Sequence, residues 1–265
     1  MKRYERLGWK SADEVGVEGS MECLEMALEE DDSKGIEEIA WNKSDLVSNR
    51  NLVAIQYFAL EDDSSMKIHA VEAVRAADEY FFGSWRSKVY KSEDGERVDA
   101  ACLRQHYDWI RDYEAALLWA SVLGDWKFLK KLGTYPTPDC QADNDYGNQG
   151  RDWFVALGAF LRQAPEAELE GLMERASAGP KRLYKLAVTV MRAGIARDAV
   201  AFQDGLIELL KYYKKSEFPK DDITKRISSE GTFFIHWAEM EKIPLMVPPE
   251  FEDHIVRLDE KTRRK

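Results

Sequence analysis

Closely spaced aspartates and glycines give the stretch 138–153, PDCQADNDYGNQGRDW, the look of a metal-binding loop. Asp143, Asp145 and Gly147 form the pattern D-x-D-x-G, which is how calcium loops begin. An EF-hand loop also needs a glutamate at its twelfth position, where both carboxylate oxygens bind the ion. Counted from Asp143, that position is Phe154. Because Asp and Asn populate turns readily, the stretch is better interpreted as a connector than as a calcium site.

The histidines and cysteines complete no catalytic or metal-binding motif. His236 and Glu239 form H-x-x-E on one helix face, but a carboxylate-bridged di-iron bundle needs two Glu-x-x-His elements. The chain has no HExxH, no glycine-rich phosphate loop and no G-x-S-x-G. Cys23, Cys102 and Cys140 are too far apart for a metal clip and do not form a disulfide framework. We therefore expect no catalytic residue, no cofactor and no metal, and we predict that the protein is not an enzyme.

Acidic side chains are concentrated near the start of the chain. The formal net charge is −11, and residues 1–63 hold 16 acidic and 7 basic residues. Between Glu18 and Glu38 there are nine acids and one base. Such a row is often only a solvated helix face, but it also suits a basic partner, since complementary charges speed association and suppress wrong partners.

Apolar residues at helical spacing predict the elements that carry these side chains. Met21, Leu24 and Leu28 would form the buried face of a helix whose opposite face is acidic. Further helices are expected at 42–60, 66–85, 98–122, 153–162, 181–193, 199–213 and 223–241, with a short capping segment after them. The sequence IEEIAW is expected as a short turn before the second helix, and 91–99 as a polar turn. Since no stretch alternates apolar and polar residues, the predicted fold class is all-α.

Similar polar turns recur between these helices, near residues 62, 124, 165 and 195. Their spacing resembles that of tetratricopeptide-like helical hairpins, although the consensus of that repeat is absent. We predict stacked antiparallel helical hairpins in an irregular tetratricopeptide-like array. The array would form one domain, 1–265, with a possible division into 1–135 and 150–265 joined by the 136–149 loop.

Composition excludes several classes of partner and location. An acidic chain does not favour nucleic acid or anionic lipid, because both require a cationic surface. The longest apolar run, near 115–123, is far shorter than the ~20 residues that span a bilayer. The first residues are basic but are followed by acids rather than by an apolar signal core. We expect a cytoplasmic protein with reduced thiols, no nucleic-acid partner and no membrane partner.

Two stretches, 50–78 and 229–256, resemble helical bacterial proteins of the polymorphic-toxin immunity class, especially the family catalogued as immunity protein forty-nine. In the second stretch the resemblance is carried by Glu230, Gly231, Thr232, His236, Pro248, Pro249 and Asp253. It implies a protein that binds a cognate toxin, possibly a nuclease acting in the cytosol, and blocks it by occlusion. The alternative is a tetratricopeptide-like scaffold or adaptor that binds a peptide or protein partner.

The immunity interpretation places the protein-binding surface on the acidic helix and on the 138–153 stretch, whereas a scaffold would hold its partner in a concave groove. The candidate partner-binding residues are Glu18, Glu22, Glu25, Glu29, Asp31, Asp32, Asp139, Asp143, Asp145 and Tyr146. The oligomeric state is not determined by these patterns.

Overall fold

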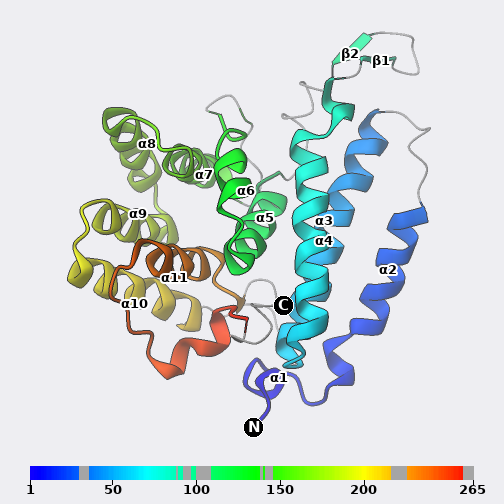
Figure 1. The fold of residues 1–265 in the computed structure, drawn as a ribbon, viewed down its shortest axis with the longest axis horizontal. Coiled ribbons are helices and arrows are strands. Elements are labelled where there is room, and N and C mark those ends of the chain that lie inside the picture. The colour runs from blue at the N-terminus through cyan, green and yellow to red at the C-terminus, as the bar shows by residue number, and fades with distance from the viewer. Residues whose placement is uncertain are drawn as a thin grey trace.

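Helices make up most of the described chain, so the all-α prediction is confirmed (Figure 1). The computed structural model describes residues 1–29, 36–87, 89–91, 97–99, 109–137, 140, 146–215 and 226–258. The α-helices are α1 (Arg3–Arg6), α2 (Val17–Glu29), α3 (Ile36–Ala59), α4 (Asp63–Phe82), α5 (Trp109–Leu123), α6 (Trp126–Leu132), α7 (Gly147–Leu161), α8 (Glu166–Ala178), α9 (Arg182–Ile195), α10 (Ala199–Lys215) and α11 (Ser229–Glu241). Short 3-10 turns lie at Asp13–Val15 (η1), Ser84–Ser87 (η2) and Pro249–His254 (η5).

Two short antiparallel strands, β1 (Val89–Lys91) and β2 (Arg97–Asp99), take up both ends of the predicted 91–99 turn, and residues 92–96 lie outside the described residues. Neither strand was predicted, because three-residue strands are too short to show alternation.

The second helix is longer than its apolar pattern predicts. α3 begins at Ile36, so IEEIAW forms its first turns rather than a separate turn before Asn42. Ile39 and Ala40 are buried and continue the apolar stripe of the helix towards its start.

α7 likewise begins at Gly147, six residues before the predicted start at Trp153, so the end of the predicted 136–149 connector is helical. The side chain of Gln149 explains the difference. Its amide nitrogen donates to the carbonyls of Ala176 (2.9 Å) and Lys181 (3.1 Å), and its oxygen accepts from the Lys181 N–H (2.8 Å). These tertiary bonds tie α7 to the α8–α9 connection and outweigh the low helix propensity of Gly and Asn.

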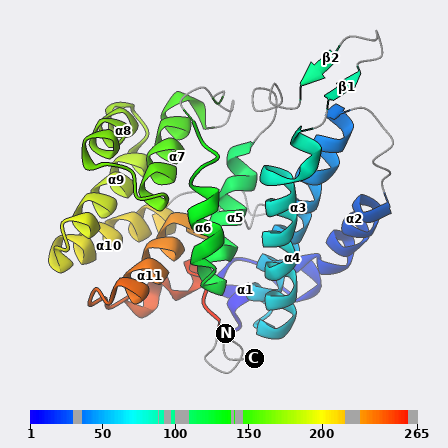
Figure 2. The same ribbon diagram turned by 45° about the horizontal axis from the view of Figure 1, so that its top comes forward.

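The helices pack in two groups on either side of α5. α3 and α4 form a long pair, with α2 against α3 at one edge of the molecule (Figure 1). On the other side α7 packs on α8 and α9 on α10, and α11 lies with them and against α5 (Figure 2). Buried side chains from α1 to the last described residues form one continuous hydrophobic cluster.

The recurrent turns noted in the sequence share one backbone geometry. In each of the four turns, a residue just after the helix lies in the left-handed region: Glu61, Gly124, Gln163 and Arg197. A fifth turn, after α11, has the same geometry at Lys242. In each turn the N–H one residue further along donates to a carbonyl five residues back, as in the Schellman motif. After three of these turns an aspartate begins the next helix by accepting the N–H three residues on: Asp62, Asp125 and Asp198.

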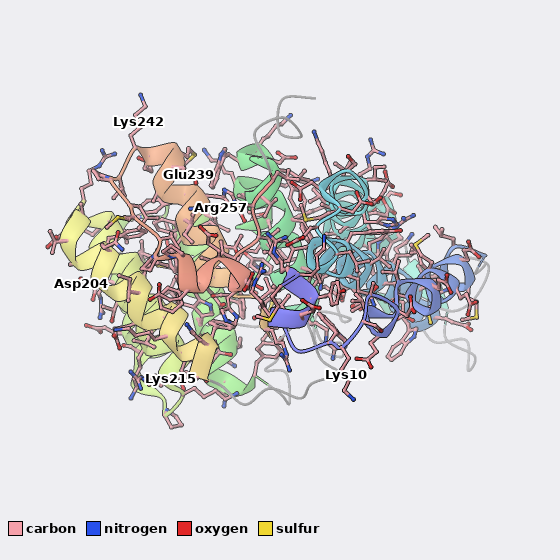
Figure 3. All side chains as sticks on the ribbon, turned by 90° about the horizontal axis from the view of Figure 1, so that it is seen from below. Lys10, Asp204, Lys215, Glu239, Lys242 and Arg257 are labelled. Carbon is pink, nitrogen blue, oxygen red and sulfur yellow. The ribbon has the colours of Figure 1, made fainter. Side chains whose placement is uncertain are left out.

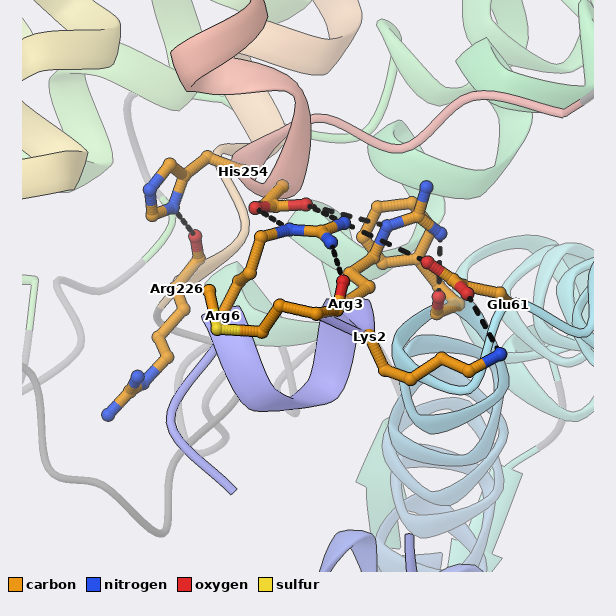
Figure 4. Close-up of polar contacts among 9 residues, drawn as sticks. Lys2, Arg3, Arg6, Glu61, Arg226 and His254 are labelled. Carbon is orange, nitrogen blue, oxygen red and sulfur yellow. Dashed lines mark hydrogen bonds and ion pairs between the residues drawn. The ribbon is translucent and has the colours of Figure 1, made fainter. Parts of the chain in front are cut away.

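The first helix is fastened to the last described segment. Arg6 binds Asp253 of η5 through two hydrogen bonds (Figure 4). Arg3 also forms an ion pair with Asp253, and Arg6 forms one with Glu61. Arg226 donates to the carbonyl of Leu7, and its own carbonyl lies 2.8 Å from Nδ1 of His254. These contacts join α1, the α3–α4 turn and η5 at one end of the molecule.

Candidate functional site

The predicted acidic row lies on the outer helix of the fold. Glu18, Glu22 and Glu25 are exposed on α2, and within the described residues their carboxylates form no hydrogen bond or ion pair. Glu29 is the last residue of α2, and Asp31 and Asp32 lie outside the described residues. Spacings of four and three residues place the three exposed glutamates on one side of the helix.

Large apolar side chains are exposed beside this row. Met26 and Leu28 are 61% and 56% exposed near the end of α2, and Trp41 is 57% exposed near the start of α3. The expectation that Leu28 lies on the buried face is wrong. α2 packs chiefly against α3, and Leu24 and Ala27 fill that narrow contact, so Leu28 falls outside it. We call Glu18, Glu22, Glu25, Met26, Leu28 and Trp41 the acidic edge.

Of the candidate residues in the 138–153 stretch, only Tyr146 lies within the described part of the chain. Tyr146 is partly buried at the start of α7, and its hydroxyl donates to Oε2 of Glu114 at 2.5 Å. Its carbonyl accepts from Nζ of Lys181 at 2.8 Å. Tyr146 is therefore held by internal contacts. The other candidates of this stretch, Asp139, Asp143 and Asp145, lie outside the described residues.

A second tyrosine–carboxyl pair lies deeper, between α10 and α11. Glu230 is fully buried, and its Oε2 accepts a 2.6 Å hydrogen bond from Tyr213. Its other oxygen, Oε1, has no hydrogen-bond partner among the described residues. Burial raises the pKa of Glu230, and the Tyr213 hydroxyl offsets part of that rise. Because both side chains are buried, the pair links α10 to α11 in the core.

Asp112, at the start of α5, is a second buried acid. It is 1% exposed and accepts hydrogen bonds from Ser44 at 2.6 Å and Ser48 at 3.1 Å. Burial raises its pKa to about 7, although both hydroxyls favour the charged form. Since α3 covers it, Asp112 links α5 to α3 rather than facing a ligand.

In the H-x-x-E pair, His236 belongs to the core and Glu239 is exposed. His236 is 3% exposed, with Nε2 3.0 Å from the carbonyl of Val256 and Nδ1 3.3 Å from Glu239. Glu239 also pairs with Arg257 at 3.5 Å (Figure 3). Within the part of the chain that the structure describes, no group of three His, Cys, Asp or Glu side chains could hold a metal ion.

A surface pocket of about 360 Å³ lies far from the acidic edge, where α7, α9 and α11 end beside α6. Its walls are mostly aromatic and aliphatic, with one acid, two basic residues and an amide. The lining residues are Trp126, Leu129, Lys130, Phe160, Leu161, Gln163, Gly194, Ile195, Arg197, Trp237, Met240, Glu241 and Ile243.

Trp237 is fixed in the wall of this pocket. Its ring centroid lies 5.2 Å from that of Phe160 and 5.9 Å from that of Phe202. Gly194 of α9 makes room for it, since a Cβ there would stand 2.5 Å from Cζ3 of the indole. The aromatic wall is therefore preformed.

The sequence analysis missed this pocket. Its lining comes from four helices and the turns that follow three of them, so no local motif contains it. The recurrent turns were the available signal, because Gln163 and Arg197 belong to them.

Comparisons with known proteins do not assign the chain to a class. No family model matches it, and no curated protein or solved structure shows significant similarity. The described helices include none that is long and apolar enough to cross a membrane.

Proposed function

We propose that the protein binds a basic protein partner through the acidic edge and inhibits it by covering its working surface, as an immunity protein covers its cognate toxin. The observation that carries this proposal is the pairing, on one outer helix, of exposed carboxylates without ion pairs and exposed Met26 and Leu28.

Two physical arguments support this use of the acidic edge. Apolar and aromatic side chains in the centre of an interface supply most of its binding energy, and Met and Trp are enriched there. Charges around that centre raise the rate of association with a partner of opposite sign. Occlusion requires no catalytic group, which agrees with the buried, structural roles of Asp112, Glu230 and His236.

The resemblance of 50–78 and 229–256 to immunity proteins supplies the kind of partner, a toxin domain. In the second stretch, Glu230 and His236 are buried and Asp253 binds Arg6. These residues therefore maintain the fold, and the partner-specific surface would lie elsewhere, as the acidic edge does.

The test begins by searching the genes beside this one for a large secreted protein, whose C-terminal domain is then taken as the candidate toxin. The domain is expressed in a bacterial host with the wild-type chain or with the variant Glu18→Lys/Glu22→Lys/Glu25→Lys. We expect the wild type to restore growth and to co-purify with the domain, and the variant to do neither while keeping its helical circular dichroism. Growth arrest that the wild type does not relieve would refute the inhibitor role. Full protection by the variant would refute the acidic edge as the interface.

A further inference from the structure

We propose that the pocket at the ends of α7, α9 and α11 binds a small aromatic carboxylate. This inference is independent of the proposed inhibitor role, because it concerns a different surface and a different class of ligand.

The walls fit a planar apolar group. Trp126, Phe160 and Trp237 line the pocket together with aliphatic side chains, and Trp237 is held by Gly194 and Phe202 before any ligand arrives. A volume of about 360 Å³ is at the lower end of the range for small-molecule pockets. It suits a ligand of one or two rings.

The polar groups of the pocket favour an anionic substituent. Lys130 lines it, and within the described residues its ammonium group forms no hydrogen bond or ion pair. Arg197 also lines it and is 73% exposed, with one contact to Glu241 at 3.0 Å. The side-chain N–H groups of Trp126 and Trp237 have no acceptor among the described residues either, so they are further donors available to an anion.

α6 sets the spacing between ring and charge. Trp126 and Lys130 are four residues apart and so lie on the same face of the helix, ~6 Å apart along its axis. A ring against Trp126 would carry its carboxylate, one or two bonds away, to the Lys130 ammonium. Indole-3-acetate has these dimensions.

The three helix ends would by themselves favour a cation, because each helix C-terminus carries roughly half a negative charge. In the last turn of each helix, however, one carbonyl already accepts an N–H of the following turn, from Ala164, Asp198 and Ile243, which reduces this preference. The ammonium group of Lys130, which carries a full positive charge, is therefore the stronger electrostatic determinant, and we expect the ligand to carry a carboxylate.

Calorimetry on the full chain with three matched ligands tests the proposal: indole-3-acetate, the neutral 3-methylindole and the cationic tryptamine. We expect indole-3-acetate to bind with a Kd on the order of 1 mM or tighter, and at least five-fold more tightly than the other two. Equal or tighter binding of 3-methylindole or tryptamine would overturn the assignment, as would no detectable binding of the acid.

Two variants locate the site. Lys130→Gln should weaken indole-3-acetate about five- to ten-fold and leave 3-methylindole unchanged, since one charge-assisted hydrogen bond is lost. Lys127→Gln is the matched control, because Lys127 is exposed on the same helix but does not line the pocket. Gly194→Ala should weaken all three ligands by displacing Trp237. If Lys130→Gln binds the acid as the wild type does, the proposal fails, whether or not Gly194→Ala folds.

Discussion

Asp253 accepts hydrogen bonds from two nitrogens of Arg6, at 2.6 Å from Nε and 2.8 Å from Nη2, so the first helix is bound to the segment that follows the last one (Figure 4). The two residues are 247 positions apart in the sequence. Because Arg3 and Glu61 join the same network, the contact also includes the α3–α4 turn. The network therefore links α1, near the start of the chain, to η5, near the end of the described residues.

We predict a measurable coupling energy for this pair. A double-mutant cycle with Arg6→Gln and Asp253→Asn, measured by urea unfolding, should give about 1 kcal/mol, the upper end for partly exposed pairs, because the geometry is bidentate. The control is Arg75 with Glu72, one exposed pair within α4, for which we expect less than about 0.5 kcal/mol. Equal coupling energies for the two pairs would contradict this account of the fastening.

Asp112 should make stability fall as pH rises. Its pKa is about 7 in the folded protein and 3.8 ordinarily, so between these values the folded state binds more protons than the unfolded state. Stability from this group is thus greatest below pH ~4 and decreases up to pH ~7, by about 4 kcal/mol in all. The variant Asp112→Asn should become more stable relative to the wild type over this window, as measured by urea unfolding at several pH values.

The control for Asp112 is Asp204→Asn, which removes an exposed carboxyl from α10 (Figure 3). Between pH ~4 and ~7, the difference in unfolding free energy between Asp204→Asn and the wild type should change much less with pH than that of Asp112→Asn. A flat difference for Asp112→Asn would show that this carboxyl is not held as described.

Tyr213→Phe should destabilise the protein by about 1–3 kcal/mol, because it leaves the buried Glu230 without its hydroxyl donor. Burial raises the pKa of Glu230 and the Tyr213 hydroxyl counteracts that rise, so the penalty should increase with pH above the ordinary range of a glutamate. Adding Glu230→Gln removes the charge and should make the effect of Tyr213→Phe independent of pH. Thermal unfolding across pH 4 to 8 measures both effects, and a pH-independent penalty in the single variant would be the contrary result.

Substitutions at the left-handed turn residues should change the free energy of unfolding in opposite directions, depending on whether glycine is introduced or removed. Gln163 and Lys242 have φ near +58°, where a side chain is strained and glycine is not. Gln163→Gly and Lys242→Gly should each raise the free energy of unfolding by about 0.5–1 kcal/mol. Gly124→Ala, at φ +71°, should lower it by a similar amount. Glycine variants less stable than the wild type would argue against the turn geometry.

Much of the fold follows from residue patterns that act locally. The apolar spacing around Leu206, Leu209 and Leu210 and the aspartates at Asp62 and Asp125 identify helices and their starts, because periodicity and capping depend on neighbours in the sequence. The start of α7 was misplaced because it depends on Gln149, whose partners lie about thirty residues away. Leu28 was misassigned because its exposure reflects how little of α2 is covered, and the sequence does not encode that locally.

Of the two candidate surfaces, one could be predicted from the sequence and the other could not. The acidic row could be recognised because Glu18, Glu22 and Glu25 share one helix. The pocket could not, since Trp126, Phe160 and Trp237 come together only when three helices meet. Tyr146 was predicted as a contact residue because it lies in the 138–153 stretch. Its hydrogen bond to Glu114 could not be predicted, because the two residues are distant in the sequence.

The most direct test of the inhibitor account is the association rate with the candidate toxin domain used in the protection assay, measured by stopped flow at several salt concentrations. For the wild-type chain we predict a rate constant that falls about ten-fold or more between 20 and 200 mM salt, because the acidic edge steers the encounter. The Glu18→Lys/Glu22→Lys/Glu25→Lys variant should associate at least about ten-fold more slowly at low salt, with little further dependence on salt. Equal rate constants for the two proteins at low salt would contradict the central claim.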